Sequence, residues 1–344
     1  MTILQQLLGI ELPIVQAPMA GVQDSALALA VGAGGGLGSL PCALLGGAAL
    51  REQLAALGAG GRPFNVNFFC HAPPAPDDLR EAAWREALAP YYREYGIDAR
   101  TIAPGPGRAP FGDESAALLE TFRPPVVSFH FGLPEPALLA RVKATGAKVI
   151  ASATTVDEAR WLEAHGADAV IAQGVEAGGH RGIFLSDDLT TQVGTLALVP
   201  QIVRAVRVPV IAAGGIADAR GVAAALALGA VAAQVGTAFL LCPEATTSAV
   251  HRAALASEAA RHTALTTLFT GRPARAIVNR LMRELGPLSP LAPAFPLAVG
   301  ALAPLRAAAE RGGSGDFSPL WSGRNASGCR AVAAAELTRA LAAV

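Results

Sequence analysis

The sequence has few cysteines, and they stand far apart. They are Cys42, Cys70, Cys242 and Cys329, and no two of them form a C-x-x-C pair. A zinc site needs clustered ligands and a disulfide framework needs regularly spaced cysteines, so this pattern argues against both. We therefore expect no bound metal, and a chain that works in a reducing compartment, the cytoplasm.

Charge is scarce as well: charged residues make up 16% of the chain, and the net charge at pH 7 is zero. Without a basic stripe or a cationic helix, we expect neither nucleic acid nor a membrane surface as a partner. The N-terminus lacks the positive segment of a signal peptide. Gly229 and Gln234 interrupt the apolar run 221–241, which favours a helix and a buried strand over a membrane span. The expected partner is a small-molecule substrate, and a homo-oligomer stays open.

Short apolar runs are abundant, in a chain that is 52% hydrophobic. They end in glycine or polar residues, and most are separated by windows long enough for a helix. This pattern is typical of buried parallel strands. Eight such strands predict an α/β fold, the (β/α)8 TIM barrel. The runs lie at 14–17, 36–39, 64–68, 126–129, 148–152, 169–173, 210–213 and 232–236.

We expect the barrel to occupy residues 1–242, with an irregular Pro- and Gly-rich insertion at about 71–125. From 243 to 320 the strand pattern stops. Helical windows, one of them at 275–284, predict an inserted, mainly helical subdomain after the eighth strand that caps the substrate. Residues 321–344 are expected to return to the barrel as a closing helix.

Glycine pairs follow the seventh and eighth strands, Gly214-Gly215 in one loop and Gly236-Thr237 in the other. Glycine lets the backbone approach a ligand closely, and consecutive N–H groups at a helix start favour an anion. Two such loops on neighbouring barrel strands predict a phosphate-binding cup. The alternative is that these glycines only serve tight turns.

Amide side chains end two other strands, Asn67 on the third and Gln173 on the sixth. Amides both donate and accept hydrogen bonds, which suits the edge of an isoalloxazine ring. Ala17, Met19 and Ala20 follow the first strand at the same mouth. Together with the cup, these residues predict FMN as the cofactor. Alternatively, the two amides satisfy loop backbone.

His180 lies beyond the sixth strand, next to Gly178 and Gly179. A histidine there faces the predicted pocket and can exchange protons near neutral pH, or hold an anion as a hydrogen-bond donor or imidazolium. We take it as the catalytic residue. His130 ends the fourth strand and is expected on the substrate side, whereas the role of His71 stays open.

At these motifs the sequence resembles the nitronate monooxygenases, once called 2-nitropropane dioxygenases, and among them the bacterial class I branch. The resemblance implies an FMN-bound barrel with a helical subdomain. It implies FMN contacts at Met19, Asn67, Gln173, Gly178, Gly215 and Gln234 to Thr237, Gly236 included, and an active-site histidine at His180. The matching stretches are PIVQAPMAG, FNVNFFCH, VSFHFGLP, AQGVEAGGHRG, PVIAAGGIAD, QVGTAFL and ARAIVNRLMRELGP.

The chain departs from the family in AFPLAVGALAPLR, where Phe295-Pro296 replaces the usual Tyr-Pro. This removes a hydroxyl from the expected substrate pocket. The resemblance implies oxidation of alkyl nitronates, notably propionate 3-nitronate, with O2 through a flavin semiquinone. An aldehyde or keto product, nitrite and nitrate would follow. A flavin-dependent enoyl-acyl carrier protein reductase that uses NAD(P)H and a non-catalytic FMN-binding module are the alternatives.

Overall fold

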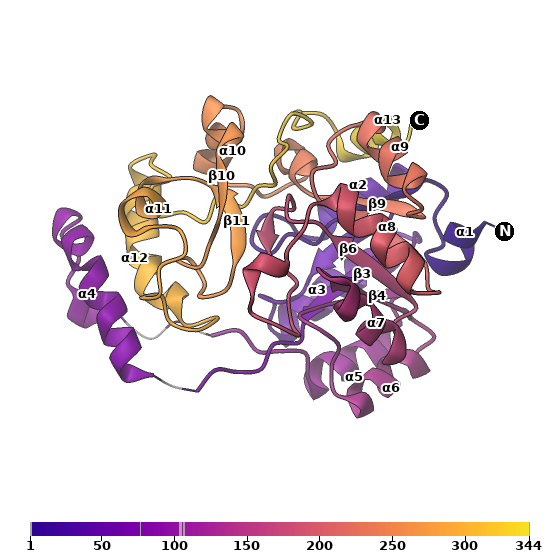
Figure 1. Ribbon diagram of the computed structural model, residues 1–344, viewed down its shortest axis with the longest axis horizontal. Coiled ribbons are helices and arrows are strands. Elements are labelled where there is room, and N and C mark those ends of the chain that lie inside the picture. Colours follow the sequence, from indigo (N-terminus) through magenta and orange to yellow (C-terminus); the bar gives the residue numbers. More distant parts are fainter. Residues whose placement is uncertain (1, 76, 103–104, 106, 344) are drawn as a thin grey trace.

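The part of the molecule on the right in Figure 1 is built around a closed sheet of parallel strands. The computed structural model describes residues 2–75, 77–102, 105 and 107–343. Its eight-stranded sheet has the order β1-β9-β8-β6-β5-β4-β3-β2, and parallel pairing of Val15 with Leu37 closes it. The predicted (β/α)8 barrel is thus confirmed. The strands are β1 (Ile14–Gln16), β2 (Gly38–Pro41), β3 (Phe64–Phe69), β4 (Val126–His130), β5 (Lys148–Ala153), β6 (Ala169–Gln173), β8 (Val210–Ala213) and β9 (Ala232–Val235).

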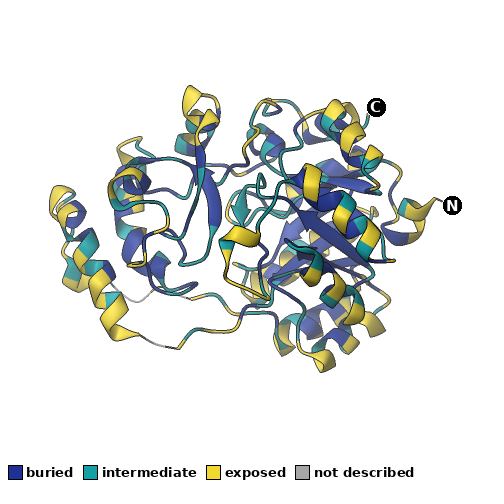
Figure 2. Cartoon of the chain, in the orientation of Figure 1, coloured by how far each residue is buried: buried dark blue, intermediate teal, exposed yellow. Residues whose placement is uncertain are grey.

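Helices cover the outside of the barrel, and their exposed faces form much of the surface (Figure 2). The predicted closing helix is present as α13 (Ala334–Leu341), which contacts α2 and α9. The helices of the barrel are α1 (Ile3–Leu7), α2 (Ser25–Ala33), α3 (Gly47–Ala59), α5 (Asp113–Phe122), α6 (Pro136–Ala144), α7 (Val156–Ala164), α8 (Thr195–Ala205) and α9 (Ala219–Ala227).

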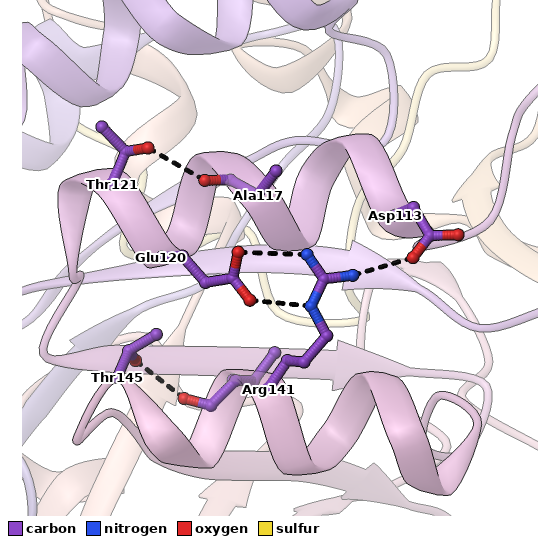
Figure 3. A network of polar contacts seen from close by, with 7 residues as sticks. Asp113, Ala117, Glu120, Thr121, Arg141 and Thr145 are labelled. Carbon is purple, nitrogen blue, oxygen red and sulfur yellow. Dashed lines mark hydrogen bonds and ion pairs between the residues drawn. The ribbon is translucent and has the colours of Figure 1, made fainter.

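An ion-pair network joins α5 and α6 on the outer surface (Figure 3). The Arg141 guanidinium donates to both carboxylate oxygens of Glu120, at 2.7 and 3.1 Å, and to Asp113 at 2.8 Å. The Asp113 side chain is 93% exposed, and solvent screens an ion pair at such a position, so the network adds little to stability. The barrel is therefore held mainly by its buried apolar side chains.

Inside the barrel, side chains change from apolar to polar along the strands. Near the N-terminal ends an apolar layer fills the interior, with members such as Val15, Val126 and Ile150. Because successive side chains point to opposite faces, the next inward position is two residues on. There Val126 is followed by Ser128, and Ile150 by Ser152. The C-terminal mouth of the barrel therefore carries the polar side chains.

A second body of structure, here called the cap, lies beside this mouth (Figure 1). Its antiparallel sheet has the order β10-β11-β7, in which β7 is the Gly179–His180 segment of the barrel. The other elements of the cap are β10 (Thr263–Thr266), β11 (Ala274–Ile277), α4 (Asp78–Glu94), α10 (Ala249–Leu255), α11 (Arg280–Leu285) and α12 (Ala298–Arg311).

The cap differs from the sequence expectation in two respects. The segment 243–320 holds two strands, and residues 275–277, expected to be helical, lie in one of them, β11. Pairing on both sides decides this conformation, because β11 bonds to β10 and to β7. Residues 76, 103, 104 and 106 of the insertion at 71–125 lie outside the described residues.

The helix of the insertion, α4, belongs to the cap. It packs on α12, where Trp84 Nε1 donates to the Ala298 carbonyl and the Tyr92 hydroxyl donates to the Ala301 carbonyl. The insertion therefore leaves the barrel, contributes a helix to the cap and returns to α5. Within the described residues, the structure contains no helix of the length and apolarity that crossing a membrane requires.

Candidate active site

One cavity lies at the C-terminal mouth of the barrel. Every residue singled out from the sequence as catalytic, cofactor-binding or substrate-binding lines it, except Phe295 and Val235, and Val235 is buried in the core. Phe295 stands close by instead, with its ring centroid 5.4 Å from that of His180. The predicted residues on the wall are Ala17, Met19, Ala20, Asn67, His130, Gln173, Gly178, Gly179, His180, Gly214, Gly215, Gln234, Gly236 and Thr237.

The two glycine loops meet on one side of the cavity. Gly214 has φ 121° and Gly215 φ 73°, conformations that strain any residue with a Cβ atom. Gly236 differs: its φ is −117°, and a Cβ would instead lie 3.3 Å from the Ala17 Cβ. No described residue accepts a hydrogen bond from the N–H of Gly215 or Gly236. These groups can therefore hold an anion.

The start of α9 is used differently from the two loops. The Asp218 carboxylate accepts from the Gly221 N–H at 2.8 Å and so caps this helix itself. A negative side chain at this position satisfies one of the free donors of the helix start. The cup is therefore built from the loop at Gly214-Gly215 and from the start of the short 3-10 helix Thr237–Leu241.

Residues near the C-terminus complete the cup. The Gly323 N–H donates to Thr237 Oγ1 at 2.9 Å, and the Asn325 side chain donates to the Gly215 carbonyl at 3.1 Å. A Cβ on Gly178 would lie 2.5 Å from the Gly323 nitrogen. Sequence reasoning missed this segment, because its contacts span about 85 to 110 residues and no local pattern marks them.

The amide side chains are occupied to different degrees. Gln173 donates to the His180 carbonyl at 2.9 Å and accepts from the Gly182 N–H at 2.8 Å. Its amide therefore bonds to loop backbone, which was the alternative to a cofactor contact. Asn67 donates to Ser128 Oγ at 3.0 Å. Gln234 lines the cavity, and its buried Oε1 has no hydrogen-bond partner among the described residues. A buried acceptor without a partner is costly, which favours a ligand there.

The loop that carries His180 is rigidly held. The fully buried Arg181 guanidinium donates to the carbonyls of Gln173 and Gly174 at 2.6 and 2.7 Å. Glu158 accepts from the Phe184 N–H at 2.7 Å. Thr155 caps α7 by accepting from the Glu158 N–H at 3.2 Å, whereas the buried Glu158 carboxylate bonds to Thr154 and to this loop.

His180 has a defined pattern of hydrogen bonds. Its Nε2 lies 2.9 Å from Thr270 Oγ1, and the Thr270 hydroxyl donates to the Arg272 carbonyl at 3.4 Å. The hydroxyl therefore accepts from Nε2–H, which leaves Nδ1 with a free lone pair. No described residue bonds to Nδ1. A neutral histidine in this tautomer can accept a proton at Nδ1.

Burial, with the positive charges of Arg108 and Arg272, moves the pKa of His180 well below its ordinary value. The ring is therefore neutral at neutral pH, and the imidazolium that we considered from the sequence is disfavoured. The Nε2–H of His130 donates to the His180 carbonyl at 3.2 Å, and burial lowers the pKa of His130 to about 3. His130 is thus a neutral hydrogen-bond donor that holds the backbone of the His180 loop.

Other wall residues carry signals that we overlooked. Ser128 and Ser152 occupy the inward positions at the ends of β4 and β5, and counting by two from the apolar layer would have found them. Arg108 and Trp321 come from outside the barrel strands, where no such rule applies.

Sequence comparisons match nearly the whole chain to proteins described as nitronate monooxygenases. The sequence model described as nitronate monooxygenase matches residues 1–343. A nitronate monooxygenase from Pseudomonas aeruginosa is 45% identical over 98% of this chain and 97% of that protein. A nitronate monooxygenase from Paraburkholderia phytofirmans is 44% identical over 97% of this chain and 92% of that protein.

Two solved structures superimpose on nearly the whole chain. A nitroalkane oxidase from Streptomyces ansochromogenes superimposes with a TM-score of 0.90 at 41% identity, covering 99% of this chain and 97% of that one. FabK from Thermotoga maritima superimposes with a TM-score of 0.72 at 28% identity, covering 99% of this chain and 94% of that one.

Proposed function

Because the chain belongs to the nitronate monooxygenase family and is an enzyme, we propose that it oxidises alkyl nitronates with O2, using FMN bound in the barrel mouth. The products proposed are an aldehyde or keto compound, nitrite and nitrate. Propionate 3-nitronate is the substrate type that we propose to test first.

The residues present fit FMN. The cup at Gly215 and Gly236 offers N–H groups suited to a phosphate, and the orphaned Gln234 Oε1 can accept from a ring N–H. Bound FMN supplies the acceptor for the electrons that leave the nitronate. The protein orients the substrate, excludes water and manages protons.

His180 has one of two duties, depending on the form of the substrate. A nitronate has already lost its α-proton, so His180 serves it as a neutral hydrogen-bonding group. A neutral nitroalkane must lose this proton before oxidation, and the free Nδ1 of His180 is the group that can take it.

We also propose that the cap, residues 243–320 together with α4, covers the substrate. Thr270 of the cap holds His180, and Phe295 packs against the same ring at 5.4 Å. Closing off a site from water strengthens the electrostatic interactions within it.

The observation that carries this proposal is the meeting of the glycine cup, the unpartnered Gln234 amide and His180 around one cavity. Purified protein should be yellow and should release FMN, not FAD, on denaturation. Under anaerobic conditions, propionate 3-nitronate should bleach the flavin absorbance quickly, whereas NADH and NADPH should act slowly or not at all. Fast bleaching by NAD(P)H alone would instead support an enoyl reductase, and bleaching by neither a binding module.

A further inference from the structure

Arg108 is a cation that faces the cavity without an acidic partner. It lies between α4 and α5 and lines the cavity. Two contacts fix the backbone around it: His71 Nε2–H donates to the Arg108 carbonyl at 3.0 Å, and the Phe111 N–H donates to the Phe69 carbonyl at 2.8 Å. His71, whose role was open from the sequence, thus positions the main chain of Arg108.

The guanidinium of Arg108 makes no hydrogen bond or ion pair with any described residue, and lies 5.4 Å from the centroid of the Phe295 ring. The two neighbouring arginines are used differently. Arg272 donates to the Ile183 carbonyl and lies over the Phe131 ring, and Arg181 donates to carbonyls of its own loop. The buried Arg272 Nε also has no partner among the described residues, but of these three arginines only Arg108 lines the cavity.

The charge of this cavity wall is one-sided. The described residues that line it include no aspartate or glutamate. Burial lowers the pKa of Arg108, yet arginine keeps its charge in proteins. Burying a cation without a counterion costs free energy. The presence of Arg108 on the same cavity wall as His180 therefore points to an anionic ligand.

We propose that Arg108 binds the carboxylate of substrates that carry one in addition to the nitronate, and so sets the preference between charged and uncharged nitronates. This inference rests on the function proposed above. The Phe295 ring lies within 5.4 Å of both Arg108 and His180, so the two groups border one small region. A short substrate can place its nitronate at His180 and its carboxylate at Arg108, where the guanidinium fork matches both oxygens.

The test compares two nitronates of similar length, propionate 3-nitronate and propyl-1-nitronate, on wild type, Arg108→Met and Arg108→Lys. Arg108→Met should lower kcat/KM for the carboxylated substrate by about 10²-fold, mainly through KM, and change that for the uncharged one by less than about threefold. Arg108→Lys should keep part of the preference. Arg100→Met removes an exposed arginine of the same insertion and should change neither value.

A second measurement does not depend on turnover. Succinate has nearly the shape and charge of propionate 3-nitronate but lacks a nitronate, and butyrate lacks the second charge. Calorimetric titration should show that wild type binds succinate more tightly than butyrate, and that Arg108→Met removes this difference while flavin content and Tm stay unchanged.

Equal losses on both nitronates would place Arg108 at the nitronate and overturn the proposal. Unchanged kinetics with unchanged succinate binding would also overturn it, as would a wild type that does not distinguish succinate from butyrate. A wild type that oxidises neither nitronate would refute the proposed function, and the succinate titration would still decide the role of Arg108.

Discussion

Replacing Thr270 by valine tests whether this threonine sets the tautomer of His180. Thr270 is 3% exposed, and its hydroxyl is the group that faces His180 Nε2, at 2.9 Å. Valine keeps the shape of the side chain but cannot accept a hydrogen bond. The Nε2–H would then lack a partner in a buried position, at a cost of about 1–3 kcal/mol.

The imidazole can avoid this cost by moving its proton to Nδ1, which then ceases to be a base. Each 1.36 kcal/mol corresponds to a factor of ten, so the competent tautomer should fall by about 5- to 160-fold. For a neutral nitroalkane such as nitroethane, kcat should fall by the same factor. For ethylnitronate, which needs no proton removal, we expect a fall of less than about threefold.

Steady-state kinetics on both substrate forms measures this difference, and nitrogen-15 NMR of labelled histidine reads the tautomer directly. Thr270→Ser restores the hydroxyl and should restore the nitroalkane activity. Equal losses on nitroethane and ethylnitronate, or an unchanged His180 tautomer in Thr270→Val, would refute the reasoning, because a merely structural defect would affect both substrates alike.

Three further predictions concern the cup, the histidine and pH. Gly215→Val should lower FMN retention more than Gly236→Ala, because only Gly215 has a positive φ; equal flavin content would contradict this. His180→Asn should lower nitroalkane activity by about 10²-fold or more and nitronate activity less, mostly in KM, as kinetics on both forms will show. Burial lowers the pKa of His251 to about 4, so the unfolded chain binds its proton first as pH falls. Between pH 6 and 4.5 His251 alone should therefore remove up to about 1.4 kcal/mol of the free energy of unfolding per pH unit, so denaturant melts of His251→Gln should show a pH slope smaller than that of the wild type by about this amount.

The barrel could be predicted from the sequence because its signals are local. Each buried parallel strand is a short apolar run bounded by turn residues, and the structure has a strand at each of the eight predicted places. The cap strands were missed because their conformation depends on pairing between distant segments. Residue 275, for example, pairs with residue 265 on one side and residue 179 on the other.

The candidate site divides in the same way. Residues at strand ends, such as Asn67 and Gln173, could be found because the fold dictates where a strand end lies. Arg108, Thr270 and Asn325 come from outside the barrel strands, and only tertiary structure brings them to the cavity. The sequence therefore predicts the side of the site that meets the cofactor better than the side that selects the substrate.

This division has a physical cause in how the mouth is built. The barrel supplies polar groups at the ends of its strands, and many of them already make hydrogen bonds within the protein. Gln173, for example, bonds to the backbone of the His180 loop. Among the described residues that line the cavity, the groups left without partners include Gln234 Oε1 from the barrel, the His180 Nδ1 that the cap residue Thr270 frees, and the Arg108 guanidinium from the insertion. Unpaired groups are the ones that a ligand can satisfy. Under the proposed function, FMN binding would therefore stay fixed in the barrel, and we expect a single change outside it, at Thr270 or Arg108, to alter which substrate is oxidised.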